Sequence, residues 1–297
     1  MGFTKVLLLG NGLNRAFGGI SWGGLLNRIN MSDFDTKYLK CPMPLQAILV
    51  TGDHIKQAMK ENQDSFFGEV KTDELRLVLR NLLSAGFTDI LTTNYSYELE
   101  IAPTEATATN KNKLIKNSRN SIPRERIEPK YLLHSFQSVS YKGTDNRVWH
   151  IHGEARKPDS MILGHYYYAN LLQRIMGHVN GRQTDYRVNP AECTIKSWVD
   201  SFILGDVYIL GFGMDYSEID LWWLLNRKKR EKGEHGKVFF YTAENEPEKE
   251  KLLELLNVQV VRAKVDKPTD EEEKNRYYKE FYRESIAEII GRVNTQL

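Results

Sequence analysis

A histidine and a carboxamide, two residues suited to acid–base work, each follow a short apolar run. His152 follows Val148 to Ile151 and precedes Gly153, and Asn94 comes two residues after the run Asp89 to Thr92. Histidine can act as a general base near neutral pH, and a carboxamide can fix the direction of a hydroxyl group or water. We therefore predict Asn94 and His152 as catalytic residues. Either residue taken alone also fits a structural role, such as an Asx turn or a buried histidine.

Two glycine-rich segments also follow apolar runs, at Gly10-Asn11-Gly12-Leu13-Asn14 and at Gly211-Phe212-Gly213-Met214. Glycine permits tight turns, and the amides of a following helix can then approach a phosphate. An ordinary strand-to-helix turn would look the same, and neither segment has the full GxGxxG spacing of a classical dehydrogenase. The predicted binding residues are Gly10, Asn11, Gly12, Asn14, Arg15, Thr93, Gly211, Phe212, Gly213 and Ser217.

The sequence predicts no metal site. The alternation of a strand would place His150 and His152 on the same side, where two imidazoles could ligate a metal. A structural zinc site needs about four closely spaced ligands, however, and the only cysteines are Cys41 and Cys193. With so few cysteines and no signal sequence, we expect a reduced, cytoplasmic protein. The formal net charge of +2 indicates neither nucleic-acid nor membrane binding.

The elements that position these segments alternate between strand and helix. Short apolar runs predict strands at 5–9, 89–92, 148–151, 207–210, 238–241 and 258–261. Helical patterns cover 21–29, 73–85, 166–179, 195–204, 217–230, 247–256 and 271–290. This order predicts an α/β fold, a doubly wound Rossmann-like parallel sheet, in which the four segments meet at the carboxyl edge.

The expected domain organisation has one main unit. Residues 1–265 form the nucleotide-binding domain, and residues 266–297 form a C-terminal helix that packs on this domain or on a partner. Residues 102–145 are rich in polar residues and predict a partly helical insertion. In the helix at 217–230 we expect Ser217 as the N-cap and Asp220 at the capping-box position.

Together and in this order, the four segments resemble the Sir2 family. The wording Gly-Asn-Gly-Leu-Asn, Thr-Thr-Asn-Tyr and His-Ile-His-Gly is most similar to its bacterial NAD-consuming branch in anti-phage defence. The stretch Tyr208 to Met214, with Ser217-Glu218-Ile219-Asp220 after it, fits the same branch. Sirtuin deacetylases carry a zinc module with paired cysteines, which this sequence lacks.

The resemblance implies NAD as substrate and cleavage of its nicotinamide–ribose bond, with release of nicotinamide and ADP-ribose. It implies phosphate and ribose contacts from both glycine segments and proton transfer by His152. Many relatives have an aspartate two residues after the asparagine, where this sequence has Ser96. The contact usually given to that carboxylate must come from elsewhere, and Glu98 is the nearby candidate.

The resemblance also implies a role as effector of an abortive-infection system. Unregulated NAD hydrolysis would kill the cell, and no sensor domain is evident, so we expect a regulatory partner protein or homo-oligomerisation. Two other functions stay open on the same fold. They are an NAD-dependent protein deacylase and a non-catalytic module that binds a nucleotide or ADP-ribose.

Overall fold

The computed structural model describes residues 3–63, 70, 72–104, 119–121, 131–188, 193–231, 235–265 and 267–295. An eight-stranded sheet runs through it in the order β3-β4-β5-β2-β1-β6-β7-β8. The strands are β1 Lys5–Leu9, β2 Asp89–Thr92, β3 Arg119–Ser121, β4 Ser135–Tyr141, β5 Thr144–His150, β6 Asp206–Leu210, β7 Val238–Thr242 and β8 Val258–Arg262. The six neighbouring strands β5, β2, β1, β6, β7 and β8 are parallel to one another. At one edge, β4 pairs antiparallel with both β5 and β3.

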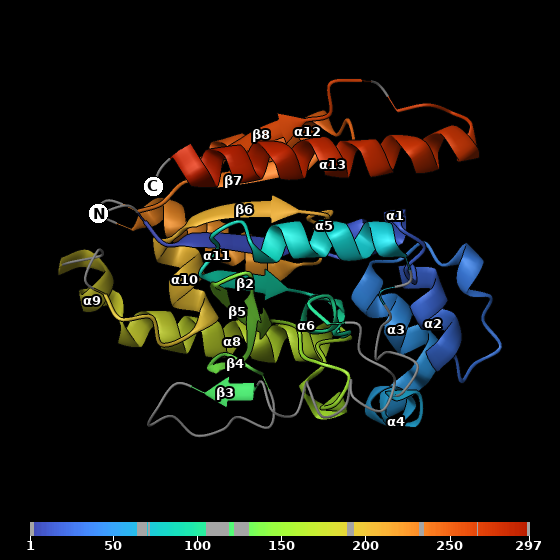
Figure 1. Cartoon of the computed structure of the whole chain (residues 1–297). Helices are drawn as coiled ribbons and strands as arrows, with labels where there is room; N and C mark the ends of the chain where they lie inside the picture. Colours follow the sequence, from blue (N-terminus) through green and yellow to red (C-terminus); the bar gives the residue numbers. More distant parts are fainter. Residues whose placement is uncertain are drawn as a thin grey trace.

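The helices lie on both faces of this sheet and beyond its carboxyl edge (Figure 1). Their bounds are α1 Gly12–Ala16, α2 Trp22–Ile29, α3 Met43–Thr51, α4 Ile55–Glu61, α5 Asp73–Leu83, α6 Glu98–Ile101, α8 His165–Gly181, α9 Gln183–Val188, α10 Trp198–Leu204, α11 Ile219–Arg230, α12 Pro247–Leu255 and α13 Glu271–Thr295. Short 3-10 turns occur at η1 Thr36–Tyr38, η2 Gly52–His54 and η4 Pro158–Ser160.

The central strands are fully buried because helices cover both faces of the sheet. All five residues of β1 are buried, with alternate side chains in different apolar clusters. Val6 and Leu8 pack with α8, α10, α11 and α12, whereas Leu7 and Leu9 pack with α1, α5 and α13. A strand covered on both faces needs apolar residues at every position, which is why it reads as a continuous apolar run. The predicted doubly wound α/β fold is therefore confirmed.

A third apolar cluster joins a small helical unit at the carboxyl edge. It contains Leu26 of α2, Val50 of α3, Met59 of α4 and Ile101 of α6. In Figure 1, α2, α3 and α4 lie together beyond the tips of the β2 and β6 arrows. This unit adds a wall at the place where the four sequence segments meet.

Several boundaries differ from those expected from sequence; helix α10, for example, begins at Trp198 and not at 195, and α13 extends to Thr295. Strand β5 begins at Thr144 and ends at His150, instead of covering 148–151, because a hairpin pairs it with β4. Within the expected insertion at 102–145, the described residues after Thr104 form β3, β4 and the start of β5, while 105–118 and 122–130 lie outside the described residues. Helix α11 begins at Ile219 and not at Ser217.

The C-terminal helix α13 packs on the sheet. Phe281, Tyr282, Ile286, Ile289 and Val293 belong to the cluster on the α1 and α5 face. None of the helices in the described ranges is both long enough and apolar enough to cross a membrane.

Candidate active site

A cavity of about 990 Å³ lies where the carboxyl ends of β1, β2, β5 and β6 meet. Small-molecule sites typically have volumes of roughly 300 to 1,000 Å³. Of the predicted site residues, Asn11, Gly12, Arg15, Thr93, Asn94, His152, Gly211, Phe212 and Gly213 line it. Gly10, Asn14 and Ser217 do not. The topology thus brings the four segments together, as the carboxyl-edge rule predicts.

The two glycine segments pack against each other and share backbone hydrogen bonds. The Gly12 amide donates a hydrogen bond of 2.7 Å to the Gly211 carbonyl, and the Gly10 amide donates one of 2.9 Å to Leu210. A Cβ atom on Gly10 would lie 2.7 Å from the Cα atom of Phe212. These glycines therefore permit close packing of the β1 and β6 loops, and the Gly12 amide is already paired.

The polar side chains of the first loop divide into two groups. Asn14 is buried outside the cavity lining, so the structure does not support its expected ribose or phosphate contact. Asn11 donates its side-chain amide to the Ile20 carbonyl at 2.7 Å. Arg15 is exposed and lines the cavity, and its guanidinium makes no hydrogen bond or ion pair with the described residues. Arg15 is therefore the cation of this loop that is available to a phosphate.

Asn94 is fixed through its backbone while one end of its side chain lacks a partner. Its amide donates to Oγ1 of Thr92 at 3.1 Å, and Thr92 donates from Oγ1 to the Leu9 carbonyl at 3.0 Å. The side chain is 8% exposed, and its Oδ1 atom has no hydrogen-bond partner. A buried carboxamide oxygen without a partner is costly, and Asn94 itself belongs to the cavity lining.

His150 holds the same loop and has no direct place in the cavity lining. Its Nδ1 lies 2.8 Å from the Asn94 carbonyl, and its Nε2 lies 2.8 Å from Oε1 of Glu100. Burial alone would lower the pKa of His150, but Glu100 and the other partners outweigh it and raise the pKa to about 9. The expectation that strand alternation puts His150 and His152 on the same side is wrong, because β5 ends at His150 and the alternation stops there.

His152 lines the cavity, and its ring is paired with a carboxylate. Nε2 lies 2.9 Å from Oδ2 of Asp220 and 3.8 Å from Oε2 of Glu218. The ring also meets the edge of Tyr168, with 5.3 Å between the ring centroids. Burial lowers the pKa of His152, but Asp220 and Glu218 outweigh it and the net shift is upward.

The sequence predicted no site role for Glu218, Asp220 or Tyr168. Glu218 is 8% exposed, and burial together with Asp220 raises its pKa to about 7, although His152 and Tyr168 oppose the shift. Burial also raises the pKa of the Tyr168 hydroxyl, with Glu218 as the next cause. Perturbed groups that gather in one cavity are typical of a functional site.

The predicted capping box at Ser217 and Asp220 is wrong. Ser217 donates from both its amide and its hydroxyl to Oδ1 of Asp215, at 2.9 and 2.5 Å. Asp220 lies one position inside α11, and its carboxylate pairs with His152 instead of returning to the backbone. An aspartate at this position can serve either as a local helix cap or in a long-range ion pair. Here Asp220 forms the long-range pair with His152.

A second carboxylate stands on the Asn94 side of the cavity. Glu98 lines it, is 9% exposed, and accepts a hydrogen bond of 2.5 Å from Ser96. Burial raises the pKa of Glu98, while the Ser96 hydroxyl lowers it. Glu98 therefore presents a carboxylate where the sequence lacks an aspartate at 96.

Helix α13 forms a further wall of the cavity that the sequence did not predict. Lys274, Asn275, Tyr278 and Tyr282 line it from this helix. Tyr278 donates to Oε1 of Glu244 after β7, and the Tyr282 hydroxyl faces Gly12. At the β7 end of the cavity, the lining therefore includes an acidic residue, Glu244, and a basic residue, Lys274.

One nitrogen and two carboxylates in the cavity could also bind a metal. Ligand atoms of His152, Glu218 and Asp220 lie within 4.8 Å of one another, and all three residues are buried. The 2.9 Å separation of His152 Nε2 and Asp220 Oδ2 is an ordinary hydrogen-bond length, so a hydrogen bond accounts for the contact. We therefore describe this group as a hydrogen-bonded pair with a second carboxylate beside it.

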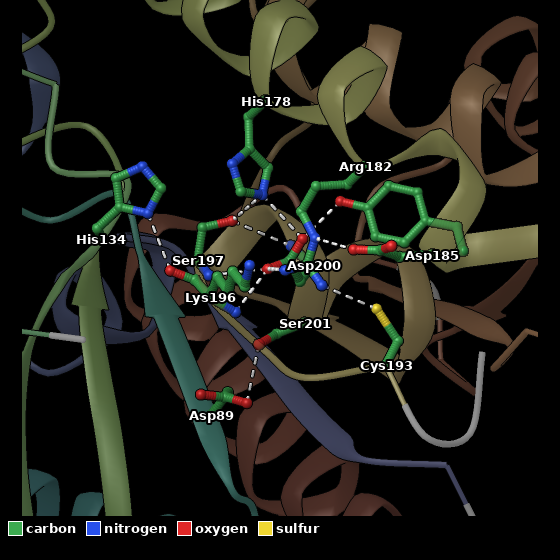
Figure 2. Close-up of polar contacts among 11 residues, drawn as sticks. Asp89, His134, His178, Arg182, Asp185, Cys193, Lys196, Ser197, Asp200 and Ser201 are labelled. Carbon is green, nitrogen blue, oxygen red and sulfur yellow. Dashed lines mark hydrogen bonds and ion pairs between the residues drawn. The ribbon is translucent and has the colours of Figure 1, made fainter. Parts of the chain in front are cut away.

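A second polar cluster surrounds Asp200 at the other end of α8 (Figure 2). Asp200 accepts hydrogen bonds from Arg182 at 2.8 Å and from the Ser197 amide at 2.9 Å. His178 contacts both Asp200 and Ser197, which resembles the composition of a catalytic triad. Both contacts use Nε2, however, whereas a triad uses one ring nitrogen for each partner. The cluster therefore joins α8 to α10 and does not activate Ser197.

The sequence matches a known protein family. The family described as SIR2-like domain matches residues 88–261, which extends from β2 into β8 and includes Asn94, His152 and the β6 loop. The first glycine loop and α13 lie outside the match. No curated protein matches the sequence. Because the match covers more than half of the chain, the protein belongs to the SIR2-like family, whose domains bind NAD.

Proposed function

We propose that the protein is an NAD⁺ glycohydrolase that releases nicotinamide and ADP-ribose. The observation that carries this proposal is the meeting of Asn94 and His152 with both glycine loops in one cavity of about 990 Å³. Membership in a family that binds NAD supplies the class of ligand.

The reaction requires no covalent bond between the protein and the substrate. The bond from C1′ of the ribose to the nicotinamide nitrogen breaks, and its electron pair neutralises the positively charged ring. The leaving group therefore needs no general acid. Water bonds to C1′ through a transition state that resembles an oxocarbenium ion, as in glycoside hydrolysis. The proton lost by this water must go to a base.

Four residues have proposed roles in this step. His152 accepts the proton from the water or from a ribose hydroxyl, because it is the imidazole in the cavity wall. Asn94 orients the water or the ribose through its carboxamide, because this residue belongs to the cavity lining. Glu98 provides negative charge near the developing cation, and Arg15 pairs with the pyrophosphate.

The test is release of nicotinamide from NAD⁺ by the purified full chain. We expect His152→Ala and Asn94→Ala to reduce release by at least about 100-fold. Asp73→Asn is a matched control, since Asp73 is an exposed aspartate in the first turn of α5 and does not line the cavity. Full activity in both cavity variants would overturn the site.

We also propose that the enzyme acts in the cytoplasm as the effector of an anti-phage system, controlled by a partner protein or by self-association. The support is the similarity of its motifs to the NAD-consuming defence branch. In bacteria carrying the gene and its neighbours, infection should lower cellular NAD, and His152→Ala should prevent the loss. An unchanged NAD level during protective infection would contradict this role.

The competing deacylase reaction uses the same cavity but an acyl-lysine oxygen as nucleophile. Its assay is the NAD-dependent loss of an acyl group from a peptide. Because the chain has only Cys41 and Cys193, it lacks the paired cysteines of the deacetylase zinc module. Nicotinamide release that depends on added acyl-peptide would replace the hydrolase proposal with this alternative.

A further inference from the structure

The Asp220 carboxylate is buried with a single hydrogen-bond partner among the described residues. It is 0% exposed, its Oδ2 atom lies 2.9 Å from Nε2 of His152, and its Oδ1 atom has no partner. Burying a carboxylate with only one hydrogen-bond donor is costly, so its position next to the ring needs an explanation.

The pairing determines which ring nitrogen carries the proton. A carboxylate accepts hydrogen bonds, so Nε2 of His152 must be the N–H that donates to Asp220. The other nitrogen, Nδ1, makes no hydrogen bond within the described residues. In neutral His152, Nδ1 therefore holds the lone pair, and it is the ring nitrogen left for a ligand in the cavity.

Three titratable groups face the His152 ring. Asp220 and Glu218 come from the start of α11, and Tyr168 comes from α8. Glu218 is farther from the ring, at 3.8 Å, and also has a hydrogen bond with Tyr168. Asp220 is thus the group placed to set the tautomer, and Glu218 adds charge beside it.

We propose that Asp220 is a positioning residue that holds His152 as the Nε2–H tautomer and directs Nδ1 toward the substrate. This inference rests on the proposed function for the role of His152 in the reaction. In that reaction the water gives its proton to Nδ1, and the imidazolium that forms is stabilised by the adjacent Asp220 carboxylate.

The tautomer can be measured without any activity. Two-bond ¹H–¹⁵N spectra of the full chain labelled at histidine distinguish the two neutral forms, with His152→Gln identifying the signal. We expect an unprotonated Nδ1 and a protonated Nε2 in the wild type. Asp220→Asn should give the other tautomer or a mixture, because an asparagine can donate as well as accept. Glu218→Gln is the matched control and should keep the wild-type tautomer.

A neutral wild-type His152 with its proton on Nδ1 would overturn the inference, and this result does not depend on the folding of any variant at position 220. An unchanged tautomer in folded Asp220→Asn would also overturn it.

Kinetics then connect the tautomer to catalysis. Asp220→Asn should lower kcat for nicotinamide release by about 10² to 10⁴-fold, as expected for loss of the correct tautomer, with KM changed less than about threefold. In a His152→Ala background the same change should have no further effect, since the two residues act as a unit. Independent, multiplicative losses would contradict the positioning role, and Asp73→Asn should keep the wild-type rate.

The two proposals can fail separately. If the wild type releases no nicotinamide under any condition, the hydrolase function fails, while the spectra still decide the tautomer. If release is fast and the tautomer is the wrong one, the positioning role fails and the hydrolase function stands.

Discussion

The hydroxyl of Ser96 donates a hydrogen bond of 2.5 Å to Oε2 of Glu98, two residues farther along the chain. Both residues line the cavity that contains Asn94 and His152. The carboxylate expected near Asn94 is thus present at a shifted position, and Ser96 supports it.

This pair leads to a prediction about charge. Glu98→Gln keeps the size of the side chain and still accepts from Ser96, but it removes the negative charge near the proposed cationic transition state. We expect nicotinamide release to fall by about 100-fold, a typical loss for one electrostatic group. Wild-type activity in Glu98→Gln would show that this carboxylate has no role in the reaction.

A matched variant tests the role of Ser96 itself. The Ser96 hydroxyl lowers the pKa of Glu98 against the effect of burial, so Ser96→Ala should raise this pKa further. Glu98 would then ionise at higher pH, and the acidic limb of the pH–rate profile should move toward alkaline pH. A uniform loss of rate at every pH would contradict this explanation.

The contact between Gly12 and α13 gives a prediction about stability. A Cβ atom on Gly12 would collide with the Tyr282 hydroxyl and lie 2.8 Å from the Gly211 carbonyl oxygen. Gly12→Ala should therefore lower the free energy of unfolding by about 1 to 3 kcal/mol, as overpacking does. Urea denaturation measures this loss.

Gly213 offers the matched control, because a Cβ atom there has no heavy atom within 4 Å although Gly213 lines the same cavity. Gly213→Ala should keep the wild-type stability. Adding Tyr282→Phe to Gly12→Ala should restore part of the loss, since one of the colliding atoms is removed. Equal losses in both glycine variants would contradict the packing argument.

The sequence predicted the sheet and the meeting point of the four segments well, for a physical reason. Strands such as β1 are buried on both faces, so they read as short apolar runs, and the carboxyl ends of parallel strands share one edge. Asn94 and His152 could therefore be placed together from residues far apart in the chain.

The partners of these residues could not be predicted in the same way. His152 and Asp220 are 68 positions apart, and no local pattern connects them. Ser217 and Asp220 match a capping box equally well, so the local interpretation concealed the long-range pair. The strand alternation linking His150 to His152 failed because the chain turns after His150. Loop conformation and side-chain pairing, not strand periodicity, determine these details.

Metal removal distinguishes the two interpretations of the cluster formed by His152, Glu218 and Asp220. Because a hydrogen bond accounts for the 2.9 Å contact, we expect that dialysis against EDTA leaves nicotinamide release unchanged. Elemental analysis of the purified protein should find no stoichiometric metal. Loss of release with EDTA, followed by recovery with one divalent cation, would identify the cluster as a metal centre instead.

The last prediction concerns pH and the loop that carries Asn94. His150 donates to the Asn94 carbonyl and pairs with Glu100, and although burial opposes these effects, its pKa rises from 6.5 to about 9. A base whose pKa is higher in the folded state stabilises folding fully below its unfolded pKa. That contribution is lost as the pH rises from about 6.5 through 9.

The shift corresponds to about 3 to 4 kcal/mol at most, since one pKa unit is about 1.4 kcal/mol. Relative to His150→Gln, the free energy of unfolding of the wild type, measured in urea between pH 6 and about 9.5, should therefore fall by this order. In His150→Gln, which keeps a hydrogen-bonding side chain without a titrating ring, this contribution should be absent. Parallel pH curves for the two proteins would show that the His150 charge does not stabilise the Asn94 loop.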